Sequence, residues 1–201
     1  MRSIAIEREF GSGGREIGRK AAGILDMPFY DGELLLSTAE RSGLDVGQLR
    51  NFDERQAGSL LFELALATNP NPYSARTHLY EMFEALQGTI RQLAQKQPSV
   101  FIGRCSTEAL SGENGPRALR VFIYASDQDQ RCRNVMATEK VNEQEARYLM
   151  RRRDKEREQY FHYFTRKNWG DRANYDIQLN TSVLSAQQCA DILVDLVRKM
   201  P

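Results

Sequence analysis

The sequence predicts a doubly wound, mainly parallel α/β sheet, on two repeated patterns. Short apolar runs bounded by turn residues recur along the chain, as buried strands do. They occupy residues 3–7, 28–31, 99–104, 119–124 and 176–180. The segments between them carry apolar stripes at helical spacing, and strands that alternate with helices favour a sheet covered by helices.

Two helical stripes are especially clear. The first consists of Leu79, Phe83, Leu86, Ile90 and Leu93 and ends before Pro98. The second consists of Cys189, Ile192, Leu193, Leu196 and Val197, behind Ser185 as the expected N-cap. The interval from Asp31 to Pro98 is longer than one crossover needs. It therefore predicts several helices in a lobe, with residues 69–72 as an internal loop.

Composition excludes several classes of protein. The 201 residues carry 28 Lys and Arg against 27 Asp and Glu, a net charge of +1, which excludes a strongly basic nucleic-acid coat. A hydrophobic content of 41% favours a packed globule over a disordered chain. The three cysteines form no C-x-x-C pair, and no apolar run approaches the ~20 residues of a membrane span. We therefore expect a reduced, cytoplasmic protein with no membrane partner.

A glycine-rich turn at residues 11–14 follows the first predicted strand and precedes a helix. Such a turn offers backbone N–H groups and a positive helix end to a phosphate. Its match to the P-loop pattern is degenerate: Gly14 and Arg15 fit, but Glu9 replaces a glycine and Glu16 replaces a hydroxyl. The alternative is a connector needed only for close packing. The position at the carboxyl end of a strand, beside a cation, favours phosphate binding.

A basic segment at residues 147–157 contrasts with the near-neutral chain, because it has six basic and two acidic residues. On a helix, two arginine pairs each share a face: Arg147 with Arg151, and Arg153 with Arg157. Their guanidinium groups could converge on a polyphosphate. One alternative is a solvated helix with ion pairs four residues apart. Another is a docking face for single-stranded nucleic acid, because aromatic residues follow the segment. We expect three of these, Tyr160, Phe161 and Phe164, to face the core instead.

These parts in this order resemble the P-loop nucleoside monophosphate kinases, and most closely the cytidylate kinase-like family. The matching stretches are residues 4–6 with the glycine turn, 101–104, 122–126 leading to Arg131 and Arg133, 151–157 and 175–182. The resemblance covers nearly the whole chain and implies one domain over residues 1–201. It implies a three-layer P-loop kinase-like fold with a five-stranded parallel sheet. A helical acceptor lobe is expected at about residues 32–97 and an arginine-rich lid at about 139–157.

The resemblance also implies transfer of the γ-phosphoryl group of ATP, with Mg²⁺, to a small nucleotide or phosphate acceptor such as CMP or a related nucleotide. Such chemistry asks the protein mainly to position two anions and to neutralise charge. The residues that would bind the donor are Gly11, Ser12, Gly13, Gly14, Arg15 and Glu16, with Glu16 as the metal ligand. Those that would close over the transfer are Arg15, Arg131, Arg153 and Arg157. Those that would bind the acceptor are Asp31, Arg41, Arg104 and Asp154.

The chain departs from the family pattern at five positions. Ser37 stands where the family has an arginine, which leaves Arg41, one turn later, as its substitute. Ile102 and Cys105 stand where that pattern has acidic residues, while Arg15 replaces a lysine and Glu16 a hydroxyl. Lysine and arginine are not equivalent beside phosphates. The alternative function is therefore a catalytically impaired, nucleotide-binding regulatory protein of the same fold. Nucleic-acid binding is a third hypothesis, weakened by the net charge of +1. The sequence does not indicate an oligomeric state.

Overall fold

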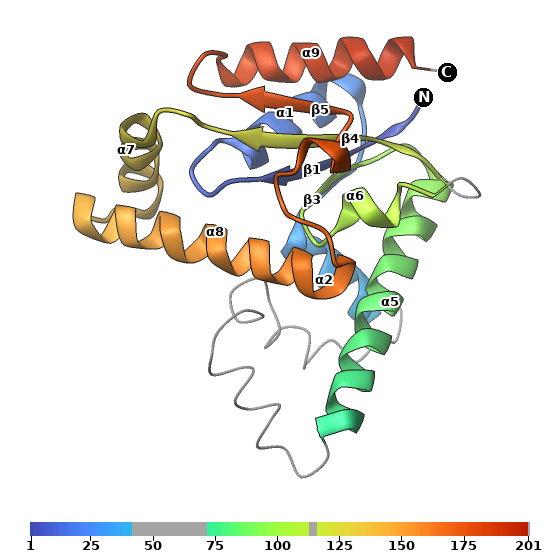
Figure 1. The fold of residues 1–201 in the computed structure, drawn as a ribbon. Coiled ribbons are helices and arrows are strands. Elements are labelled where there is room, and N and C mark those ends of the chain that lie inside the picture. The colour runs from blue at the N-terminus through green and yellow to red at the C-terminus, as the bar shows by residue number, and fades with distance from the viewer. Residues whose placement is uncertain (42–71, 113–115, 201) are drawn as a thin grey trace.

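The computed structural model describes residues 1–41, 72–112 and 116–200, and a five-stranded parallel sheet lies at its centre (Figure 1). The strand order is β2-β3-β1-β4-β5. The strands are β1 (Ser3–Arg8), β2 (Phe29–Tyr30), β3 (Val100–Ile102), β4 (Ala118–Tyr124) and β5 (Ile177–Asn180). All five predicted strands are confirmed, with ends that differ by at most two residues.

Helices connect these strands and cover both faces of the sheet. They are α1 (Gly14–Leu25), α2 (Gly32–Arg41), α5 (Pro72–Lys96), α6 (Ser106–Ala109), α7 (Gln128–Glu139), α8 (Glu143–Thr165) and α9 (Ala186–Lys199), with a 3₁₀ turn η1 (Arg172–Asn174). The predicted parallel α/β architecture is thus confirmed. The predicted loop at 69–72 lies outside the described residues, apart from Pro72, which begins α5.

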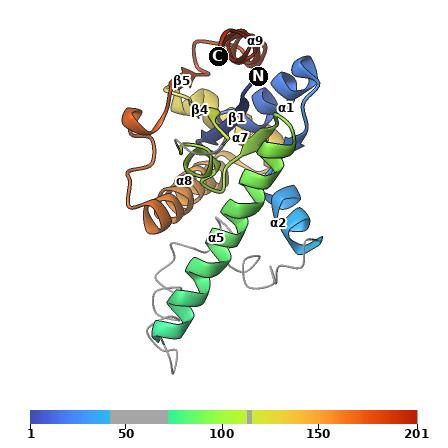
Figure 2. The ribbon, with the colours of Figure 1, turned by 90° about the vertical axis from the view of Figure 1, so that its right-hand side faces the viewer.

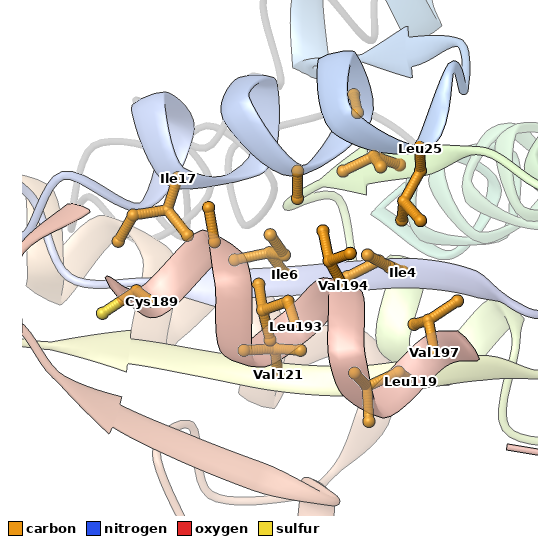
Figure 3. Close-up of a cluster of buried hydrophobic side chains, with 14 of the residues drawn as sticks. Ile4, Ile6, Ile17, Leu25, Leu119, Val121, Cys189, Leu193, Val194 and Val197 are labelled. Atoms are coloured by element: carbon orange, nitrogen blue, oxygen red, sulfur yellow. The ribbon is translucent and has the colours of Figure 1, made fainter. Parts of the chain in front are cut away.

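One face of the sheet packs against α1 and α9 (Figure 3). Alternate residues of β1 place Ile4 and Ile6 on this face, where they meet Ile17 of α1 and Leu193 of α9, all fully buried. The predicted N-cap of α9 is confirmed, because the Ser185 hydroxyl accepts a hydrogen bond from the Gln188 N–H at 3.2 Å. This face therefore forms the larger apolar core. The loops at the carboxyl ends of the strands lie outside it.

Replacing Leu193 with alanine is expected to lower the free energy of unfolding by about 2–5 kcal/mol, because the deletion leaves a cavity between α9 and the sheet. Leu34, whose surface is 45% exposed, supplies the matched control. Its replacement with alanine should change that free energy by no more than about 0.5 kcal/mol. Urea unfolding measures both values, and equal effects would contradict the assigned core.

The opposite face is covered by α2, α5 and α6, which pack on Ala5 and Phe101. Helix α5 extends away from the sheet in Figure 2. Its residue Phe83 stacks on Phe164 of α8, with ring centroids 4.1 Å apart. Tyr160 and Phe161 of α8 are almost fully buried in the same cluster, so the prediction that these aromatics face the core is confirmed.

Helix α8 begins at a capping box that the sequence carries at Asn142 and Glu145. The Asn142 side chain accepts from the Glu145 N–H at 2.9 Å, and the Glu145 carboxylate accepts from the Asn142 N–H at 3.3 Å. From there α8 runs without a break to Thr165. The segment expected as a lid, 139–157, thus comprises the last residue of α7, a short turn and the first part of α8. No helix within the described residues is long and apolar enough to span a membrane.

Candidate functional site

The glycine turn lies between the carboxyl end of β1 and the first residue of α1. Gly13 caps α1 with φ +80°, a left-handed conformation that glycine adopts without strain. The first helical hydrogen bond runs from the Ile17 N–H to the Gly13 carbonyl at 3.0 Å. The N–H groups of residues 14–16 therefore have no acceptor within the helix and face its N-terminal end. This end carries the partial positive charge that attracts an anion.

Helix α7 lies directly against the turn. A Cβ atom on Gly11 would fall 2.5 Å from the Val135 Cγ2 atom, so only glycine permits this close approach. The Asn134 side chain donates a hydrogen bond to the Gly11 carbonyl at 3.3 Å. The buried Ser12 hydroxyl donates to the Glu9 carbonyl at 2.8 Å and also lies 3.2 Å from the Ile123 carbonyl of β4. The turn is thus held in one conformation before any ligand arrives.

The Arg131 guanidinium joins the turn to α8. It is buried, and it pairs with the Glu9 carboxylate at 2.7 Å and with the Asp154 carboxylate. The same Glu9 carboxylate accepts the Ala125 N–H at 2.9 Å. Asp154 in turn accepts the Phe10 N–H of the turn at 2.7 Å. One arginine therefore lies between two carboxylates at the base of the turn.

Burial and hydrogen-bonded contacts shift the pKa of the Asp154 carboxyl in opposite directions. Burial raises the pKa of its carboxyl above the ordinary value, and this effect outweighs the hydrogen bond from Phe10 and the charge of Arg131, which lower it. Arg157, also on α8, donates to the Arg8 carbonyl at 2.9 Å and lies over the Phe10 ring at 5.5 Å. Helix α8 thus contributes a carboxylate and a guanidinium to the glycine turn.

A second group of side chains gathers where β3 ends. Gly103, Arg104 and Cys105 have φ values of +71°, +60° and +54°, so three successive residues are left-handed. This conformation costs a non-glycine residue roughly 1–2 kcal/mol, and such strain concentrates at functional sites. The Gln87 side chain of α5 holds the turn by donating to the Arg104 carbonyl at 2.9 Å.

The strained turn directs Arg104 to the start of α2, beside Asp31. A Cβ atom on Gly32 would lie 2.8 Å from the Arg104 Nε atom. Asp31 accepts the Leu34 N–H at 3.1 Å, which caps α2, and it pairs with Arg15 at 2.5 Å. Burial raises the pKa of Asp31, but the hydrogen bonds from Leu34, Arg15 and the Glu33 N–H together with the charge of Arg15 outweigh it, so its pKa lies below the ordinary value. Arg15, in the first turn of α1, therefore connects the glycine turn with the Asp31 group.

Other arginines of the basic segment have ion-pair partners of their own. Arg153 pairs with the buried Glu156 at 3.3 Å, and Arg152 pairs with the same carboxylate at 2.8 Å. Arg147 pairs with Asp129 and with Glu143, four residues earlier. Part of the basic segment is thus a helix with local ion pairs, as one alternative expected. Arg41 ends α2, and its side chain lies outside the described part of the chain.

Sequence reasoning missed Glu9, Phe10 and Gln87 as members of the site. Glu9 was noticed only as a departure from the P-loop pattern, although a charged residue that directly follows a buried strand is itself a signal. Phe10 contributes through its N–H and its ring, and Gln87 through its contact with Arg104. No sequence pattern marks Gln87, because it lies on a helix 17 residues from its partner.

The residues that the structure describes contain no group of three or more His, Cys, Asp or Glu side chains suited to a metal ion. Glu16 is exposed in the first turn of α1 and pairs with Lys20 at 3.7 Å. Magnesium is commonly held by one or two carboxylates together with substrate phosphates and water. A single carboxylate in the first turn of α1, directly after the glycine turn, is compatible with that pattern.

Comparisons with known proteins agree with one another on the family and the fold of the chain. The model of the cytidylate kinase-like family matches residues 3–183. A crystal structure of an uncharacterized protein from Eubacterium ventriosum ATCC 27560 is 26% identical, with a TM-score of 0.74 over all of both chains. Shikimate kinase from Bacteroides thetaiotaomicron is 15% identical, with a TM-score of 0.51 over 98% of each chain, and shares the fold. A search of curated proteins found no match.

Proposed function

Because the chain belongs to the cytidylate kinase-like family, we propose that it transfers the γ-phosphoryl group of ATP to a small nucleotide acceptor such as CMP. One observation carries the proposal: arginines from two helices, Arg131 and Arg157, meet at a glycine turn that opens onto a helix N-terminus. Phosphoryl transfer needs such convergent N–H groups and cations. It needs no covalent nucleophile.

The donor phosphates would lie on the turn of residues 11–14, where the first N–H groups of α1 can donate hydrogen bonds to an anion. Arg131 and Arg157 would neutralise charge on the transferred group. Both must then exchange a present partner for phosphate oxygens, because Arg131 pairs with carboxylates and Arg157 binds a carbonyl. Glu16 would hold Mg²⁺, which would supply positive charge to the donor phosphates.

The acceptor would lie beside Asp31 and Arg104. A guanidinium suits an anionic group of the acceptor, and a carboxylate suits a hydroxyl donor. Arg15 stands between this group and the glycine turn, since it pairs with Asp31 and belongs to the first turn of α1. Its side chain is 61% exposed, so it can turn from Asp31 toward the transferred phosphate.

A second candidate is a regulatory protein that binds nucleotide without turnover. The observation that favours it is that Arg15 pairs with Asp31 while Asp154 accepts the N–H of the glycine turn. A coupled ADP-release assay over nucleoside monophosphates and other phosphate or hydroxyl acceptors decides between the two. Acceptor-dependent ADP release supports the kinase. ATP binding with no release for any acceptor supports the regulatory protein.

ATP binding is expected to raise the thermal midpoint of the protein, because a ligand that binds only the folded state stabilises it by mass action. With MgATP at about 5 mM, the wild type should shift upward, and Arg157→Ala should shift less. Arg147→Ala is the matched control, because Arg147 also lies on α8 but pairs with Asp129 and Glu143. Differential scanning fluorimetry measures all three proteins. A flat response of the wild type would contradict the donor site.

A further inference from the structure

The anion that already lies on the glycine turn belongs to the protein itself. The Asp154 carboxylate accepts the Phe10 N–H through one oxygen at 2.7 Å and pairs with Arg131 through the other. A backbone N–H of the turn together with a guanidinium is the set of donors that a phosphate oxygen requires. The carboxylate therefore occupies Arg131, which the proposed donor would use, and the N–H of Phe10, the residue directly before the glycine turn.

Arg131 does not need Asp154 for charge balance. Glu9 already pairs with the same guanidinium at 2.7 Å, and its carboxylate is fixed by the Ala125 N–H at 2.9 Å. Asp154 is thus a second carboxylate on one buried arginine, and the two are anchored alike: each accepts one backbone N–H, and the Glu9 and Asp154 side chains are 24% and 19% exposed. Two carboxylates that share one cation repel each other. If Asp154 left, Arg131 would still be paired with Glu9, so no unpaired buried charge would remain.

We propose that Asp154 is an internal competitor of the phosphoryl donor and sets the affinity of the glycine turn for polyphosphate. The inference rests on the proposed function, since it concerns the same donor site. A phosphate and a carboxylate cannot both occupy the Phe10 N–H, and their like charges exclude each other at that distance. The donor therefore binds only the fraction of molecules in which Asp154 has left, and its apparent dissociation constant rises accordingly.

The test uses isothermal titration calorimetry with inorganic tripolyphosphate and, separately, with a non-hydrolysable ATP analogue and Mg²⁺. Asp154→Asn keeps the shape and a hydrogen-bond acceptor but removes the charge. It is expected to bind tripolyphosphate about tenfold more tightly than the wild type. Asp129→Asn is the matched control, because Asp129 likewise joins α7 to α8 through an arginine, Arg147, away from the turn. Its affinity should equal that of the wild type.

The outcomes separate this inference from the proposed function. Tighter binding by Asp154→Asn alone supports the competitor, because a variant that merely disturbs the fold binds more weakly. Equal or weaker binding by Asp154→Asn, with a wild type that binds the ATP analogue, overturns the inference and leaves the kinase proposal intact. Absence of binding by the wild type and both variants overturns the donor site, and this inference with it.

Discussion

Arg131→Ala is expected to lower the free energy of unfolding by about 3–5 kcal/mol, because it leaves the Glu9 and Asp154 carboxylates without their shared cation. The Arg131 side chain is only 6% exposed, so water does not replace it. Urea unfolding at neutral pH measures the loss. The same variant should show no acceptor-dependent ADP release if the proposed function is right.

The control for this experiment is Arg147→Ala. Arg147 also pairs with two carboxylates, Asp129 and Glu143, but its side chain is 37% exposed and both partners are more exposed still. Exposed ion pairs contribute little to stability, because water and salt screen them. A loss for Arg147→Ala as large as that for Arg131→Ala would show that burial is not what distinguishes the two arginines.

Asp31→Asn is expected to reduce turnover by about 100-fold while donor binding stays close to that of the wild type. The change removes the charge that holds Arg15 at 2.5 Å, and a misplaced group near the reacting atoms costs about that factor. Steady-state kinetics with the acceptor identified by the ADP-release assay measures turnover. Calorimetry with the ATP analogue measures donor binding.

Asp127→Asn serves as the matched control for Asp31→Asn. Asp127 is the N-cap of α7, where it accepts the N–H groups of Asp129 and Gln130 at 2.9 Å, as Asp31 caps α2. It has no contact with Arg15 or Arg104 among the described residues. Equal losses of turnover in both variants would mean that capping, and not the acceptor site, explains the effect.

The sequence predicted the sheet well because apolar runs and turn residues report burial directly. All five strands and the C-terminal helix with its Ser185 cap follow from local pattern. The length of α8 was harder to predict. The basic residues that suggested a separate lid and the aromatic residues that pack in the core belong to one helix. The capping box at Asn142 and Glu145 marks the true start of α8, and it is visible in the sequence.

Pairing within the candidate site was not predictable from local pattern. The basic segment suggested that several arginines converge on one ligand, yet Arg153 pairs with Glu156, three residues away. The candidate site is held together by contacts between residues far apart in the sequence. Phe10 and Asp154 are 144 residues apart, and Arg8 and Arg157 are 149 residues apart. Only the folded chain reveals that carboxylates occupy the groups expected to bind phosphate.

The continuity of α8 also has a mechanical consequence. Its aromatic end is fixed in the cluster that Phe83 of α5 forms with Tyr160, Phe161 and Phe164, and Asp154 lies six residues before Tyr160. At 1.5 Å per residue, that separation is an arm of about 9 Å. A tilt of about 20° around the cluster would displace Asp154 by roughly 3 Å, which is enough to break its hydrogen bond to Phe10. A rotation at the aromatic end of α8 would thus release the Phe10 N–H at the glycine turn.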